Sequence, residues 1–275
     1  MQPAVAASSP GVSVEMPRLY QVLGPDLVPH DLMAFLDTWG GNILALGALI
    51  LIVILMTRAA SRSEAVPGRF QNAVEAVVEV LESLFRDILG SSTREFLPFL
   101  GTLFLFILFM NLTGLIPLLH SPTSQFEITL SLAIVVFCYV QIVATRKLGL
   151  IGYIDHLMSR PRDFVSWLLA PLMLLLHLVA ELARPISLAL RLFGNITGEE
   201  ALIAAFTGLG VLALSTTGSP VGVPLGLPFI FLGMLFGLVQ AFVFTILSAI
   251  YIAQVLPPEG EDHGKDTIQS EGAVR

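Results

Sequence analysis

One arginine lies deep inside an apolar stretch of this sequence. Arg191 is flanked by Leu190 and Leu192, and residues 185–195 contain no other charged side chain. A charge at the centre of a membrane helix costs about 2.5–3.5 kcal/mol on insertion scales. Arginine cannot escape this cost by losing its proton, because the pKa of its guanidinium stays above about 12. We therefore expect Arg191 to face a polar path or an acidic partner, rather than to extend past its apolar neighbours to the membrane surface.

Other polar residues share one face with Arg191. On a helical wheel of about 100° per residue, one arc of about 80° collects most of them. The arc holds His177, Glu181, Arg184, Arg191 and Asn195, with Glu199 at its edge, Ser187 bordering it and Leu188 as its one apolar member. Such polar seams inside membranes usually mark ion or proton pathways, or the counter-ions of ligands. Internal pairing of Glu181 with Arg184 and His177 is an alternative, but it leaves Arg191 without a partner.

A second polar face lies near the C-terminal end of the apolar region. It consists of Gln240, Ser248, Tyr251 and Gln254, with Gly233 and Gly237 a turn or two earlier. Small residues let membrane helices approach closely. Gln240 fits either an interhelical hydrogen bond or a pathway, and pairing the two polar faces would make a hydrated interface. No membrane-embedded carboxylate is placed to face Arg191, so its counter-charge is expected from another polypeptide.

The composition predicts an all-α integral membrane protein. Mean hydropathy is +0.83, and 13% of residues are charged, against about 25% in soluble domains. We expect about five membrane-crossing helices, two of them long, tilted and packed as a hairpin, plus one amphipathic surface helix. The expected segments are an N-terminal segment 1–34, spans at about 39–57, 96–119, 128–145, 164–214 and 227–256, a surface helix at 70–89, a polar and basic connection at 148–163, and a polar tail 257–275.

Several smaller features narrow the possibilities. The polar face of the surface helix is acidic, whereas interfacial helices usually carry a basic one, so a protein partner fits it at least as well as lipid head groups. Cys138 is expected to be a packed core thiol. We expect no metal site, cofactor or disulfide within the chain. Nothing indicates nucleic-acid binding, and no phosphate loop or activated nucleophile is present.

The basic residues predict the orientation in the membrane. They fall on one side, whereas the opposite loops, 120–126 and 215–226, contain no Lys or Arg. The basic set is Arg58, Arg62, Arg69, Arg146, Lys147, Arg160, Arg162 and Lys265. The positive-inside rule places this side in the cytoplasm, so five crossings put the N-terminus outside and the C-terminus inside. Residues 1–30 lack the plan of a signal peptide, so the first span is expected to serve as its own insertion signal.

Residues 184–195 resemble the signature of subunit a of the F-type ATP synthase. The segment reads Arg-Pro-Ile-Ser-Leu-Ala-Leu-Arg-Leu-Phe-Gly-Asn. Residues 240–251 are similar to the final helix of that family, and residues 109–112 (Phe-Met-Asn-Leu) to its second span. The resemblance covers roughly residues 35–256, and a charged motif of this kind inside a membrane helix is rare.

The resemblance implies a stator subunit of a rotary proton translocator. In that family, two offset half-channels lead to a rotating ring of small hairpin c subunits, each with a buried carboxylate. Arg191 would face those carboxylates. The implied proton path comprises Asn195, Glu200 and Gln240 on the outer side, Ser187 towards the cytoplasm, and Glu199, His177, Glu181, Tyr251 and Asn111. The other implied partners are the peripheral-stalk b subunits and the rest of the complex, in a bacterial inner membrane. The chain would not be an enzyme on its own.

The sequence departs from the family pattern at two places. Some members carry His or Glu where this chain has Gly233, and some carry an acid where it has Gly114. Glu199, Glu127 and His120 are candidates to take over those roles. A self-contained secondary transporter or channel is the competing hypothesis, although no paired repeat typical of transporters is visible. A scaffold for other membrane subunits is a third hypothesis, which leaves Arg191 unexplained.

Overall fold

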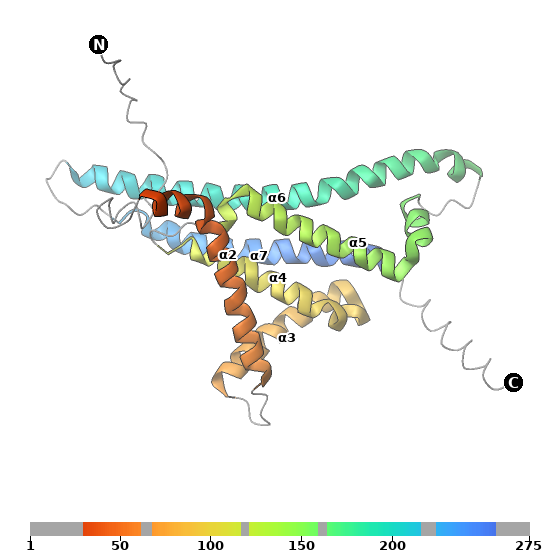
Figure 1. Ribbon diagram of the computed structural model, residues 1–275, viewed down its shortest axis with the longest axis horizontal. Coiled ribbons are helices and arrows are strands. Elements are labelled where there is room, and N and C mark those ends of the chain that lie inside the picture. The colour runs from red at the N-terminus through yellow and green to blue at the C-terminus, as the bar shows by residue number, and fades with distance from the viewer. Residues whose placement is uncertain (1–29, 62–67, 117–120, 159–163, 216–223, 257–275) are drawn as a thin grey trace, which may run out of the picture. The chain divides into compact units, whose positions relative to one another are not determined.

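The computed structural model describes residues 30–61, 68–116, 121–158, 164–215 and 224–256. Helices make up nearly all of this part of the chain, and it contains no strand. The elements are α2 (His30–Ser61), α3 (Arg69–Leu89), η1 (Gly90–Ser92), α4 (Thr93–Thr113), η2 (Pro122–Ser124), α5 (Phe126–Leu157), α6 (Phe164–Ser215) and α7 (Leu227–Val255). Figure 1 traces them in chain order. The prediction of an all-α membrane protein is confirmed.

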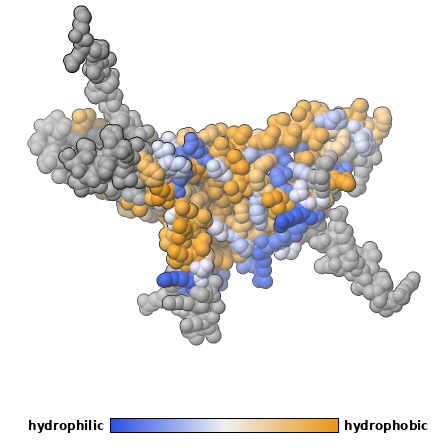
Figure 2. Space-filling view, in the orientation of Figure 1, coloured by the Kyte–Doolittle hydropathy of each residue, from blue (hydrophilic) through white to orange (hydrophobic). Residues whose placement is uncertain are grey.

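Five described stretches are long and apolar enough to cross a membrane. They are Thr38–Arg58, Gln71–Thr113, Phe126–Gly149, Trp167–Gly210 and Leu227–Val255, the second of which runs through α3 and α4. Many of their large apolar side chains are exposed, and orange, apolar surface covers much of the visible α2 and α6 in Figure 2. Exposed apolar side chains are what a lipid environment requires of a helix.

The chain divides into two compact units. Unit 1 contains residues 1–63, 102–129 and 190–243, and unit 2 contains residues 64–101, 130–189 and 244–275. Unit 1 buries Ile107, Met110, Leu192, Ile196 and Ile203. Unit 2 buries Phe85, Phe96, Leu100, Val136 and Ile252. Helices α4, α5, α6 and α7 each contribute residues to both units.

Helix α6 is one helix of 52 residues that contains Pro171 and Pro185. This agrees with the expectation of a single helix at 164–214. A proline removes one backbone donor, which membrane helices tolerate when neighbouring groups re-satisfy the backbone. Helix α7 packs against α6 as predicted for a hairpin. In unit 1 the rings of Phe206 and Phe229 stack with centroids 4.0 Å apart, and in unit 2 Arg184 lies over the Tyr251 ring.

Helix α3 is the predicted amphipathic surface helix. Leu81, Phe85 and Leu89 recur every fourth residue and are buried, whereas Glu79 and Asp87 are exposed. Gly90 ends the helix at φ 55° and donates its backbone N–H to the Arg86 carbonyl. This positive φ is a conformation that glycine adopts at little cost.

Two expectations about α4 and α5 were wrong. Helix α4 ends at Thr113 rather than near residue 119, and residues 117–120 lie outside the described residues. Helix α5 does not end at Arg146 and Lys147. It bends at Gly149 (φ 71°, ψ 164°) and continues to Leu157, so part of the predicted polar connection is helical. The basic pair marks the end of the apolar span, but only the backbone conformation of Gly149 reveals that a second helical segment follows.

Cys138 is exposed rather than packed in the core. Its neighbours on α5 explain this, since Ile134, Val135 and Ile142 are exposed as well. The buried face of α5 carries Val136 and Val140 instead. An apolar run in a membrane helix therefore does not separate lipid-facing from buried positions, because both are hydrophobic.

The bend at Gly149 gives a first test. Its combination of φ and ψ is nearly exclusive to glycine and costs other residues about 1–3 kcal/mol. We expect Gly149→Ala to loosen residues 150–157, measured as faster hydrogen exchange of their backbone amides. Gly152→Ala is the matched control, because a Cβ there would make an ordinary 3.6 Å contact with Leu148. Equal exchange rates in the two variants would contradict the bend.

Candidate functional site

Arg191 lies on α6 in unit 1 with an exposed side chain, between exposed Leu190 and buried Leu192. Among the described residues, no carboxylate oxygen lies within 4 Å of its guanidinium, and it makes no hydrogen bond to them. The charge is therefore presented outward from the chain. An unpaired cation on an apolar helix is unfavourable unless something outside this part of the chain compensates it.

Asn195, one turn beyond Arg191, connects α6 to α7. Its Nδ2 donates to Oε1 of Gln240 at 2.7 Å. Gln240 is buried, and its Nε2 has no hydrogen-bond partner among the described residues. This contact realises the predicted pairing of two polar faces. A buried amide donor without a partner costs about 1–3 kcal/mol, so this position favours a polar guest such as water.

Glu199 lies against Gly233 of α7. A Cβ atom at Gly233 would overlap the Glu199 carboxylate and would come 2.9 Å from Leu115. Glycine at this position therefore makes the space that the carboxylate fills. The Oε2 atom of Glu199 is buried and has no hydrogen-bond partner within the described chain. Glu199 thus brings an acid to one of the two places where the sequence departs from the family pattern.

Glu200 reaches a different helix from Glu199. Its Oε1 accepts the backbone N–H of Ser121 at 2.8 Å, and it would lie 3.2 Å from a Cβ at Gly114. The second departure from the family pattern therefore also lies against a glutamate from α6. Glu127 is exposed at the start of α5, and His120 lies outside the described residues.

Asn111 connects three elements of unit 1. Its Nδ2 donates to the Gly237 carbonyl on α7 at 3.0 Å, and its Oδ1 accepts the Thr123 hydroxyl of η2 at 2.8 Å. The close approach depends on Gly237, where a Cβ would come 3.2 Å from the Asn111 Cβ. Unit 1 thus brings Asn111, Glu200, Ser121 and Thr123 together.

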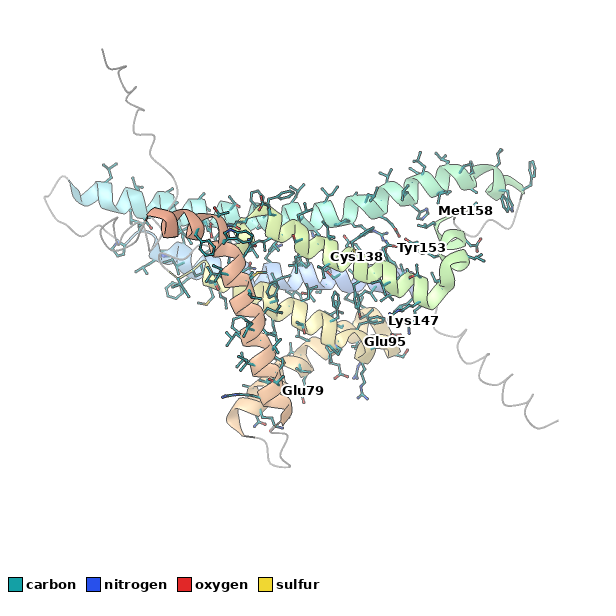
Figure 3. The ribbon with its side chains drawn as sticks, viewed as in Figure 1. Glu79, Glu95, Cys138, Lys147, Tyr153 and Met158 are labelled. Atoms are coloured by element: carbon teal, nitrogen blue, oxygen red, sulfur yellow. The ribbon has the colours of Figure 1, made fainter. Side chains whose placement is uncertain are left out.

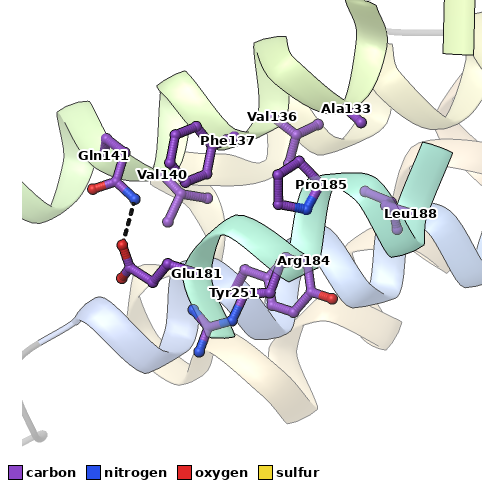
Figure 4. Close-up of a pocket in the computed structure, with 10 residues that line it drawn as sticks. All are labelled: Ala133, Val136, Phe137, Val140, Gln141, Glu181, Arg184, Pro185, Leu188 and Tyr251. Carbon is purple, nitrogen blue, oxygen red and sulfur yellow. Dashed lines mark hydrogen bonds between the residues drawn. The ribbon is translucent and has the colours of Figure 1, made fainter. Parts of the chain in front are cut away.

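Two of the remaining predicted residues, Glu181 and Tyr251, line a pocket in unit 2 (Figure 4), whereas Ser187 is exposed and His177 is not among the lining residues. The pocket is lined by Ala133, Val136, Phe137, Val140, Gln141, Glu181, Arg184, Pro185, Leu188 and Tyr251. The Arg184 guanidinium lies 5.2 Å from the Tyr251 ring centroid, a cation–π geometry. His177 Nδ1 lies 2.9 Å from the Met173 carbonyl oxygen.

The alternative pairing of Glu181 with Arg184 and His177 is wrong for the described chain. Glu181 instead contacts Gln141 and Tyr153. Neither contact was predicted from the sequence, because Gln141 is a single polar residue within the span expected at 128–145 and Tyr153 falls in the connection expected at 148–163. It also missed Ser121 and Thr123. A polar side chain in the middle of an apolar span was the one available signal, and it applied to Gln141.

Comparison with known proteins agrees with this architecture. The sequence model of the family described as ATP synthase A chain matches residues 42–253. This chain belongs to that family. It is 42% identical to ATP synthase subunit a of Protochlamydia amoebophila over 247 residues, which are 90% of this chain and 91% of the relative. It is 39% identical to subunit a of a Geobacter species (strain M21) over 204 residues, 74% of this chain and 82% of the relative.

Membership of the ATP synthase A chain family fixes the general role. The chain is a membrane subunit of a proton-translocating F-type ATP synthase, and it is a non-catalytic component of that complex. The ATP chemistry therefore belongs to other subunits.

The contact between Gly233 and Glu199 gives a second test. A methyl group at residue 233 must displace the carboxylate, and misplacing a reacting group by about 1 Å can cost about 100-fold in rate. We expect Gly233→Ala to slow ATP-driven proton pumping, measured by dye quenching in membrane vesicles. Gly47→Ala on α2 is the control, because nothing lies within 4 Å of a Cβ there. Equal pumping per assembled complex in both variants would show that the carboxylate position is unimportant.

Proposed function

We propose that this chain is the stator that guides protons to and from a rotating ring of c subunits, with Arg191 facing the ring carboxylates. The exposed guanidinium of Arg191 carries the proposal. It lies on an apolar helix face beside exposed Leu190 and Ile186, and the described part of the chain offers it no acid within 4 Å. A neighbouring subunit that presents carboxylates supplies the missing charge.

The physics of a fixed cation suits this role. At an effective dielectric constant near 20, two unit charges 4 Å apart attract by about 4 kcal/mol. That attraction favours the ionised form of a ring carboxylate and so displaces its proton, yet it is weak enough for the ring to move on. Because arginine does not release its own proton, it cannot pass protons directly from one half-channel to the other.

The polar residues of unit 1 fit the outer half-channel. Asn195 and Gln240 bond across α6 and α7, and Glu199 and Glu200 project from α6 towards Gly233 and Gly114. Asn111 belongs to the same unit and bonds to the Gly237 carbonyl of α7 and the Thr123 hydroxyl of η2. Two buried polar atoms here, Glu199 Oε2 and Gln240 Nε2, have no partner among the described residues. We assign these residues to proton entry, with Glu199 taking the role left open by Gly233.

Unit 2 fits the cytoplasmic half-channel. Glu181 and Tyr251 line its pocket, His177 lies one turn before Glu181 on α6, and Ser187 is exposed on α6. The unit also contains the basic residues Arg146 and Lys147, which the positive-inside rule assigns to the cytoplasmic side. This orientation places the N-terminus outside and the C-terminus inside a bacterial inner membrane. The peripheral-stalk b subunits and the rest of the complex are the other proposed partners.

A self-contained transporter or channel is the weaker hypothesis. Such a protein would have to balance the charge of Arg191 with its own residues, and the described chain places no acid beside it. Proton uptake by the isolated chain in liposomes would favour that hypothesis. Co-purification with a ring of small hairpin subunits would favour the rotary one.

The role of Arg191 gives a third test. We expect Arg191→Ala and Arg191→Lys each to abolish proton-driven ATP synthesis in vesicles, because alanine removes the charge and a lysine held in hydrocarbon can lose its proton. Arg94→Lys is the matched control, since Arg94 is exposed and its nearest acid, Glu82, lies 3.5 Å away. Co-purification of the c ring confirms assembly. Normal synthesis with either Arg191 variant would refute the proposal.

A further inference from the structure

Glu181 is one of three polar side chains in unit 2 that form a closed set of hydrogen-bonding contacts, the others being Gln141 and Tyr153. It is 8% exposed, and its Oε2 lies 2.9 Å from Gln141 Nε2 and 2.6 Å from the Tyr153 hydroxyl. The same hydroxyl lies 2.5 Å from Gln141 Oε1. Figure 4 shows Gln141 and Glu181 facing each other across the pocket, and Figure 3 shows Tyr153 on the segment that follows the α5 bend.

The number of protons available to Glu181, Tyr153 and Gln141 decides which of their contacts can be hydrogen bonds. A phenol has a single proton, so Tyr153 cannot donate to both Glu181 and Gln141. With an ionised Glu181, one short oxygen–oxygen contact therefore has no proton between its atoms. If the Gln141 amide is flipped, its carbonyl oxygen faces the Glu181 carboxylate. That oxygen–oxygen contact then has no proton between its atoms.

A neutral Glu181 satisfies every contact. The carboxyl group donates to the Tyr153 hydroxyl, Tyr153 donates to Gln141 Oε1, and the Gln141 amide donates back to Glu181 Oε2. Each of the three donors then has one acceptor. Buried polar groups are normally hydrogen-bonded in this complete way, so the geometry matches the protonated acid.

The position of Arg184 gives an independent argument. It lies three residues after Glu181 and lines the same pocket, where an ionised carboxylate would attract it strongly. Its guanidinium instead lies over the Tyr251 ring, and no ion pair with Glu181 forms within 4 Å among the described residues. The other ionisable groups around Glu181 are Tyr153, Tyr251 and, one turn earlier, His177.

We propose that Glu181 is a proton-holding residue of the cytoplasmic half of the path, with Tyr153 and Gln141 as positioning residues. The inference rests on the proposed function, in which protons pass through unit 2. When a proton arrives through water in the pocket, an O–H bond forms on the Glu181 carboxylate. All three hydrogen bonds among Glu181, Tyr153 and Gln141 can then form. When that O–H bond breaks, the proton passes to water and the carboxylate is left ionised.

Tyr153 orients the acid without giving up its own proton. Burial raises the pKa of Tyr153 above that of a free phenol, so the phenol stays protonated at neutral pH. Its reach to Glu181 depends on the bend at Gly149, after which residues 150–157 resume the helix. Tyr153 therefore acts on proton transfer only through Glu181.

The test uses the assembled ATP synthase in membrane vesicles. We expect Glu181→Gln to slow ATP-driven proton pumping by about ten-fold, and Tyr153→Phe to slow it less while shifting its pH profile. The double variant should be no slower than Glu181→Gln alone, because Tyr153 acts through Glu181. Glu95→Gln is the matched control, since this exposed acid pairs only at the surface with Lys147 (Figure 3), an interaction worth about 0–1 kcal/mol.

Infrared difference spectra of the same samples test the protonated acid directly. A carbonyl band of a protonated carboxyl group should disappear in Glu181→Gln and shift in Tyr153→Phe. If Glu181→Gln fails to assemble, the Tyr153→Phe spectrum and pH profile decide alone, and no change in either overturns the inference. An unchanged pumping rate per assembled Glu181→Gln complex also overturns it. In that case loss of synthesis in Arg191→Lys would still support the proposed function.

Discussion

The whole arrangement depends on a guanidinium that cannot be neutralised and that lies in a hydrocarbon environment. Its cost is tolerable only if a polar or acidic neighbour approaches it. Arg191 is exposed and has no such neighbour within the described chain. The helix that carries it presents Arg191 on an exposed face, and elsewhere in unit 1 it packs against α7. The pairs Asn195–Gln240 and Phe206–Phe229 hold that helix in place within unit 1.

The polar groups of the two units differ in how completely they are satisfied. In unit 1, Asn111 has partners for both its donor and its acceptor, whereas Gln240 Nε2 and Glu199 Oε2 have none among the described residues. In unit 2, Glu181 can be fully satisfied by Gln141 and Tyr153. Because membrane interiors supply little water, unsatisfied groups are costly. Their presence in unit 1 is consistent with a hydrated route there, and the closed set of hydrogen-bonding contacts in unit 2 with a site that stores a proton.

Sequence alone predicted that the chain is helical and where most of its long apolar helices lie, because hydrophobic length and helical periodicity are local properties. It could not predict which partners the polar residues of α6 choose. Glu181 contacts Gln141 and Tyr153 rather than Arg184, because the pairing depends on how α5 and α6 are rotated about their axes and on the backbone of Gly149. Cys138 was misplaced for a similar reason, since lipid-facing and buried positions in a span have the same composition.

The crossing of α6 and α7 at Gly233 has a broader consequence. The volume beside that glycine holds one carboxylate, and Glu199 now supplies it. A side chain at position 233 and a glutamate at position 199 compete for this volume, so enlarging residue 233 requires the Glu199 carboxylate to move or to be replaced by a smaller group. If the two residues were exchanged, with glycine at position 199 and glutamate at position 233, α7 instead of α6 would carry the carboxylate that fills this volume. The point in space that holds the acid is therefore set by where the two helices cross, and not by which of them carries the carboxylate.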